Sequence, residues 1–357
     1  MFVTAVENFV LFGTLLALCG FVAACAARLA TLRGWWEPHP QTLTRLYSLA
    51  LIFPPVTATW IVIAAFLPEW WLGEEAFGAA HSAPLHQLHL LSDLTAALEP
   101  RLAYATLTFA AAASAFAAVS SVLGYLRVGR VVGRLEMAAA PPRPEQVEMV
   151  KEAAGRHRIS VGLLMSDCPL SFVWGFRNPK LVLSSGLLNA LTPEQLCGVI
   201  EHEAAHYTRR DNIVKLVLSV ASYLSLAFPL SRLVLRWRAE QVELVCDEVA
   251  AGRTSEPLEI AQALVRVRRA GASLAADSVA ASGFTPDGAR GFERRVRRLV
   301  SFADYLPSPA HTEALARAPR AVALATAAVF ALTLVAALAL TPLTVHRAVE
   351  SFIKLLS

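Results

Sequence analysis

The sequence predicts a mainly α-helical membrane protein, with four transmembrane helices and an α+β domain inserted between the third and the fourth. The chain has 357 residues, of which 55% are hydrophobic and only 17% charged, whereas soluble domains have about 25% charged residues. Its apolar residues gather in four stretches without Asp, Glu, Lys or Arg, and a polar segment with mixed helix and strand patterns separates the last two. This distribution indicates a lipid environment.

Each of the four uncharged stretches is long enough to cross a bilayer, because about 20 apolar residues in a helix span the ~30 Å of hydrocarbon. A cleaved signal peptide is the alternative for the first stretch, but no basic residue precedes it and Glu7 stands where one is expected. The stretches lie between Glu7 and Arg28, Arg45 and Glu69, Arg101 and Arg127, and Arg320 and Arg347.

The basic residues predict the orientation, because Lys and Arg favour cytoplasmic loops. The first loop contains Arg28, Arg33 and Arg45, whereas the second, from 69 to 99, contains five acidic residues and no basic one. We therefore expect a multi-pass protein of the bacterial inner membrane, with its N-terminus outside. The net charge of +4 follows from this bias and does not indicate direct nucleic acid binding.

The chain is expected to divide into four parts. Residues 1–138 contain the first three membrane helices, 139–320 form a cytoplasmic domain, 321–345 are the fourth membrane helix, and 346–357 form a short tail outside. The five cysteines are scattered and form no C-x-x-C pair, which is compatible with a reducing cytoplasm.

The cytoplasmic domain begins with a predicted helix over 144–156. Three short β-like runs follow, over 159–165, 171–174 and 180–183, and these suggest a small antiparallel sheet. Another helix is expected from Thr192, which can cap it while Gln195 closes a capping box. The apolar run 216–231 is short for a membrane span, so we expect a helix that is buried in the domain or lies against the membrane.

The helix that follows Thr192 contains an H-E-x-x-H pattern, His202-Glu203-Ala204-Ala205-His206. Residues four apart share a helix face, so both imidazoles can bind one zinc ion. Glu203 lies beside them and can take a proton from a metal-bound water. The alternative is a chance match, with two histidines that have only structural roles.

A catalytic zinc needs a third protein ligand. No third histidine follows at short range, but a later helical segment contains Glu240, Glu243, Asp247 and Glu248. We expect Glu243 to be the third ligand and Asp247 to accept a hydrogen bond that orients a histidine ligand. The alternative for this acidic group is a solvated helix face.

Four segments together resemble the BlaR/MecR-type antirepressor peptidases, which are integral-membrane zinc peptidases of the gluzincin kind. The resemblance implies a cytoplasmic gluzincin-like domain between the third and fourth membrane helices. The pair Cys246-Asp247 favours this family over the HtpX-type quality-control proteases. Only a few residues follow Arg347, so the family's penicillin-binding sensor, and with it β-lactam sensing, is not expected. The segments are 178–188 with the H-E-x-x-H helix, 209–212, 243–248 and 292–299.

The expected function is therefore zinc-dependent hydrolysis of a cytoplasmic protein, such as a transcriptional repressor or the chain itself. The alternatives are HtpX-like quality control and a zinc-binding signalling protein that cleaves nothing. Two further features stay open. The strand 181–184 can offer an edge to a peptide substrate or simply pack in the sheet, and the loop histidines can bind metal or be incidental. These histidines are His81, His86 and His89.

Candidates for a donor to the reaction's oxyanion are Tyr207, Arg209 and Arg210, each of which can equally be structural. Arg210 and Asp211 are a candidate ion pair near the helix end.

Overall fold

The computed structural model describes the first helices and most of the domain that follows them. The third predicted membrane helix is described only at scattered positions, all of them helical. The fourth predicted membrane helix, the C-terminal tail and the loop with His81, His86 and His89 lie outside the described residues. The described residues are 2–72, scattered positions between 105 and 130, 144–175, 178–224, 228–277 and 289–317.

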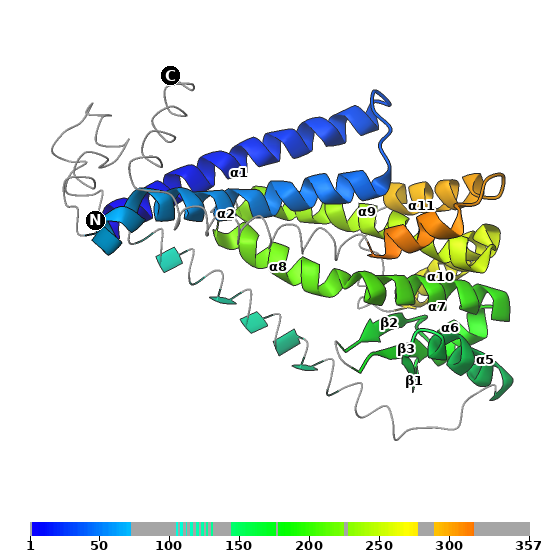
Figure 1. Cartoon of the computed structure of the whole chain (residues 1–357). Helices are drawn as coiled ribbons and strands as arrows, with labels where there is room; N and C mark the ends of the chain where they lie inside the picture. Colours follow the sequence, from blue (N-terminus) through cyan, green and yellow to red (C-terminus); the bar gives the residue numbers. More distant parts are fainter. Residues whose placement is uncertain are drawn as a thin grey trace.

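The helices α1 (Phe2–Leu32) and α2 (Pro40–Leu72) form an antiparallel pair at one side of the molecule (Figure 1). Within the described residues, Gly13–Leu32 is the one stretch that is long and apolar enough to cross a membrane. It coincides with the first predicted span. The second predicted span falls in α2, whose side chains are described only as far as residue 60.

A three-stranded sheet consists of β1 (Ser160–Leu164), β2 (Ser171–Trp174) and β3 (Lys180–Ser184), in the order β1-β3-β2. The expected antiparallel sheet is wrong in one respect, because β3 pairs antiparallel with β2 but parallel with β1. Residues 181–183 of β3 are all buried. This strand, the most apolar of the three, occupies the centre of the sheet. The strand 181–184 therefore offers no sheet edge to a peptide.

The sheet packs on α5 (Pro144–Gly155), α6 (Ser185–Ala190) and α7 (Pro193–Arg209) around a core that includes Leu183 and Ile200. The predicted start of α7 is confirmed. Thr192 Oγ1 accepts a hydrogen bond from the Gln195 amide, and the Thr192 amide donates to Gln195 Oε1. These two bonds fix the register of the helix that contains the H-E-x-x-H pattern.

The helices α8 (Asp211–Leu224) and α9 (Phe228–Thr254) both contact α7 and α2. The apolar run 216–231 lies partly in α8 and partly in α9, with 225–227 outside the described residues, and side chains from both helices pack against α2 in a common core. Helix α9 packs on α7 and on α2, so it joins the two histidines to the N-terminal helices (Figure 1). The chain continues with α10 (Pro257–Asp277), α11 (Ala289–Ser301) and a helical segment over 309–317.

Candidate metal centre

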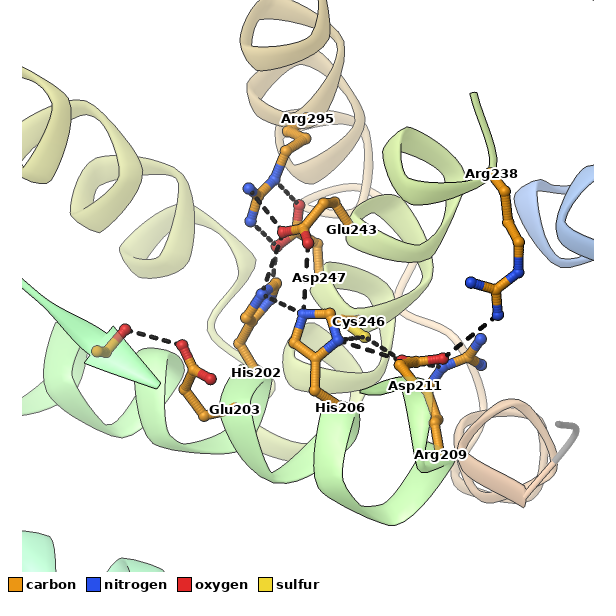
Figure 2. A network of polar contacts seen from close by, with 11 residues as sticks. His202, Glu203, His206, Arg209, Asp211, Arg238, Glu243, Cys246, Asp247 and Arg295 are labelled. Carbon is orange, nitrogen blue, oxygen red and sulfur yellow. Dashed lines mark hydrogen bonds and ion pairs between the residues drawn. The ribbon is translucent and has the colours of Figure 1, made fainter. Parts of the chain in front are cut away.

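The two histidines of α7 and Glu243 of α9 lie together, as the sequence predicts (Figure 2). His202 Nε2 lies 3.2 Å from His206 Nε2, and the two carboxylate oxygens of Glu243 each lie 3.5 Å from one of these nitrogens. All three ligand atoms are within 4.8 Å of one another. Two imidazole nitrogens and one carboxylate oxygen make a donor set that suits a catalytic zinc.

The other ring nitrogen of each histidine faces a carboxylate. His202 Nδ1 lies 2.9 Å from Asp247 Oδ1, at the position that the sequence analysis gave to Asp247. His206 Nδ1 lies 3.1 Å from Asp211 Oδ2, a partner that the sequence analysis missed. A carboxylate at Nδ1 holds the ring proton there, which leaves the lone pair of Nε2 for a metal.

The ion pair expected between Arg210 and Asp211 is replaced by one between Arg209 and Asp211. Arg209 Nε donates to Asp211 Oδ2 over 3.1 Å. The reason lies in the backbone, because Arg210 ends α7 in the left-handed conformation with φ of 57° and lines a cleft, whereas Arg209 still belongs to the helix. The sequence does not reveal which of two adjacent arginines takes the turn conformation.

Arg295 of α11 holds both predicted carboxylates of α9. Its Nε and Nη2 donate to the two oxygens of Asp247 over 2.7 and 2.8 Å, and its Nη1 lies 3.0 Å from Glu243 Oε2. Burial alone would raise the pKa of Glu243, but Arg295 and the two histidines lower it well below its usual range. Both carboxylates are thus kept ionised, as a metal site requires.

Glu203 faces a different partner from the other acidic residues. Ser171 Oγ of β2 donates a hydrogen bond to Glu203 Oε1 over 2.8 Å (Figure 2). Glu203, His206 and Glu243 all line one cleft of ≈ 500 Å³, whose walls come from β2, the end of α7 and α8. The predicted proton acceptor and two predicted ligands therefore share a cleft large enough for part of a peptide.

Two of the suggested oxyanion donors, Tyr207 and Arg210, line the same cleft. The third, Arg209, is fully buried and bonded to other groups. Burial and committed donors give Arg209 a structural role and leave Tyr207 and Arg210 as candidates.

A second group of two histidines and a carboxylate lies farther along α9. Glu248 accepts hydrogen bonds from His39 Nε2, over 3.0 Å to each oxygen, and from Arg298 Nη2 over 2.9 Å, and His311 Nε2 lies 3.1 Å from Glu248 Oε1. Burial alone would raise the pKa of Glu248, but His39 and Arg298 lower it to about 2. Glu248 belongs to the acidic group of the predicted helix, but no local sequence pattern indicates this cluster.

The part of the chain that contains the site is similar to a known protein family. Residues 144–290 match Peptidase family M48. A "Protease HtpX homolog" of Acidiphilium cryptum is 28% identical over 198 residues, which are 44% of this chain and 69% of the relative. Another from Gemmatimonas aurantiaca is 26% identical over 36% of this chain and 57% of the relative. No solved structure matches.

A third "Protease HtpX homolog", from Methanocaldococcus jannaschii, is 33% identical over 24% of this chain and 31% of the relative. The chain thus spans about a third to two thirds of the lengths of these relatives. Their names agree with the M48 match and do not bear out the finer BlaR/MecR-type assignment. Together these matches show that the segment with both histidines, Glu203, Glu243 and Asp247 is similar to the M48, HtpX-like peptidases.

Proposed function

We propose that this chain is a membrane-bound zinc endopeptidase, in which His202, His206 and Glu243 hold the metal and Glu203 is the general base. The observation that carries the proposal is that three metal donors lie together and that two of them, His206 and Glu243, share one cleft with the separate carboxylate of Glu203. A protein that only binds zinc has no need of Glu203 in this position. This arrangement therefore favours the catalytic proposal over the non-proteolytic alternative.

The bound zinc would supply a Lewis acid and an activated water at the cleft. Glu203, whose Oε1 accepts a hydrogen bond from Ser171 Oγ, would take up a proton and later return it to the leaving amine. Asp247 and Asp211 keep the two imidazoles oriented. Arg295 keeps the pKa of Asp247 low against the effect of burial, so this carboxylate stays ionised.

We propose that the substrate lies along β2 as an extended segment. Within the described residues β2 is an edge strand of the sheet and lies next to the cleft, which Phe172 and Val173 line. A peptide added beside an edge strand gains main-chain hydrogen bonds, which do not depend on its side chains. Such binding suits a locally unfolded protein segment.

The identity of the substrate separates two forms of the proposal. In the first form, which the sequence predicts, the substrate is one cytoplasmic protein, such as a repressor or the chain itself. In the second form, which the similarity to HtpX proteases favours, the chain is a quality-control protease with many substrates. Comparing the proteins that accumulate in cells with the Glu203→Gln variant distinguishes them. One or two stabilised proteins support the signalling form, and many stabilised membrane proteins support quality control.

The cytoplasmic location of the domain is part of the same proposal. A reporter fused after Pro144 is expected to behave as a cytoplasmic one, because basic residues flank this side of the predicted spans. Reporter activity outside the membrane would contradict the proposed class of substrate.

The test of catalysis is Glu203→Gln in the purified full chain. Hydrolysis of an unfolded protein substrate is expected to fall by about 10²–10⁴-fold, because the general base is lost, while zinc content stays unchanged. Glu194→Gln is the matched control, since Glu194 is an exposed carboxylate on the same helix. Undiminished hydrolysis in Glu203→Gln with zinc bound would refute the assigned role. A wild-type protein that binds zinc and cleaves nothing would support the non-proteolytic alternative.

A further inference from the structure

We propose that the start of α2 helps to hold the metal ligand His206 in position. Gln41 and Ser48 of this helix fix two buried arginines, Arg209 and Arg238, which in turn hold Asp211 against His206. The arginines are then positioning residues that act on a metal ligand through Asp211. This inference rests on the proposed function only in that His206 binds the metal.

Arg209 is the central member of this network. Its side chain has no exposed surface. Its Nε donates to Asp211 Oδ2, while its Nη1 donates to Gln41 Oε1 over 3.0 Å and to the carbonyl of Leu315 over 2.8 Å. One guanidinium thus joins α2, the end of α7 and the 309–317 segment at the carboxylate that faces His206.

Arg238 of α9 gives a second connection between α2 and Asp211. Its Nε donates to Ser48 Oγ over 2.9 Å, and its Nη2 lies 3.9 Å from Asp211 Oδ1. Gln41 and Ser48 are seven residues apart, which is close to two turns of helix, so they share one face of α2. That face therefore contacts the surroundings of the metal centre at two points.

The network is buried, and this makes it sensitive to the position of α2. Gln41, Arg209 and Asp211 are all at most 6% exposed, so water cannot replace a lost partner. If α2 shifts, Arg209 loses an acceptor and has to reorient, and Asp211 is released with it. His206 Nδ1 then loses the partner that fixes its ring.

The position of α2 in the chain gives this coupling a direction. Helix α2 begins at Pro40, shortly after the candidate membrane span Gly13–Leu32, and packs along α1. A displacement of the N-terminal helices therefore reaches the metal ligand through two hydrogen bonds and one carboxylate. The simpler alternative is that Gln41 and Arg209 only attach α2 to the domain. In that case a substitution of Gln41 does not change the zinc affinity.

The zinc dissociation constant of the purified full chain, measured by competition with a chelator, separates the two views. Gln41→Leu is expected to weaken zinc binding by about tenfold or more, as for other partners of metal ligands, and to change the absorption spectrum of the cobalt-substituted protein. Gln41→Glu keeps an acceptor for Arg209 and is expected to stay within about threefold of wild type. Thr44→Val is the matched control, because Thr44 is buried on α2 between these residues and its hydroxyl bonds only within its own helix.

Wild-type zinc affinity and an unchanged cobalt spectrum in folded Gln41→Leu would overturn the inference, and so would an equal loss in Thr44→Val. If Gln41→Leu does not fold, Ser48→Ala removes one oxygen from the second connection. Weaker zinc binding in that variant supports the inference, and wild-type binding overturns it. A wild-type chain that binds no zinc would refute the proposed function, whereas zinc binding that is indifferent to Gln41 and Ser48 refutes only the inference.

Discussion

Helix α9 presents two groups of two histidines and a carboxylate, and they are built differently. At the metal centre, His202 and His206 turn Nε2 toward Glu243 and Nδ1 toward a second carboxylate. At the second cluster, His39 also turns Nε2 toward a carboxylate, Glu248. Its Nδ1, however, accepts a hydrogen bond from the Gln41 amide over 3.1 Å. His39 therefore differs from His202 and His206 in what holds its second ring nitrogen.

This difference decides what each group can bind. A ring nitrogen that accepts from an amide carries no proton, so His39 has its proton on Nε2 and donates it to Glu248. A ring nitrogen that faces a carboxylate keeps its proton, so Nε2 has a lone pair for zinc. Proximity of two histidines and a glutamate is thus insufficient for a metal site. The second cluster is better described as an ion-pair junction that joins the residue before α2 to α9, α11 and the 309–317 segment.

The largest expected effect concerns zinc content. The wild-type chain is expected to bind about one zinc. His202→Ala is expected to weaken that binding by more than about 100-fold, because losing a ligand reduces zinc affinity more than losing a residue that is bonded to a ligand. His39→Ala is expected to leave zinc content unchanged. Elemental analysis after dialysis checks all three. Two zinc ions in the wild type, with one lost in His39→Ala, would show that the second cluster also binds zinc and would contradict this comparison.

A smaller effect is expected from Arg295→Met, which leaves Glu243 and Asp247 without their cation. In the metal-free protein the free energy of unfolding is expected to fall by about 3 kcal/mol. The loss is expected to be smaller with zinc bound, since the metal then balances the carboxylates. Thermal unfolding with and without a chelator measures this. Arg297→Met is the control, because this arginine of the same helix is 80% exposed and pairs with Glu293. Equal losses with and without zinc would contradict the arrangement.

The smallest effect is expected at the ion-pair junction. The pKa of Glu248 is about 2 in the folded protein and about 4.3 in an unfolded chain, so its ionised form stabilises the fold above about pH 4.3 and this stability is lost toward pH 2. Glu248→Gln is expected to cost on the order of 1–3 kcal/mol at pH 7. Unfolding from pH 7 to pH 3 should show the gap to wild type narrowing. A gap that stays constant with pH would show that the charge of Glu248 contributes nothing.

Local sequence patterns predicted the parts of this protein that local interactions determine. The cap at Thr192, the three strands within a residue or two, and the clustering of Glu243 and Asp247 with the two histidines all agree with the structure. Residues four apart on a helix have a fixed relation, so the pairing of His202 with His206 needed no knowledge of the tertiary fold. The approach of Glu243 and Asp247 from another helix was instead predicted from the need of a catalytic zinc for a third ligand.

The missed features depend on contacts between distant segments. Arg295 approaches Asp247 from another helix, and Gln41 is 168 residues from Arg209. The sheet order was missed for the same reason, since it depends on which strand the helices bury. The sequence suggests Arg210 as the ion-pair partner of Asp211, but the partner is Arg209, because Arg210 takes the left-handed conformation at the end of the helix.

The hydrogen bond from Arg209 to the Leu315 carbonyl has a consequence for the order of events during synthesis. A growing chain that has reached Asp247 already contains every predicted ligand, yet Arg209 still lacks one of its acceptors. Chains fold from the N-terminus as they emerge, so the surroundings of His206 are completed late. A ribosome-bound chain without Leu315 is therefore expected to hold its metal ligands loosely until synthesis has passed that residue.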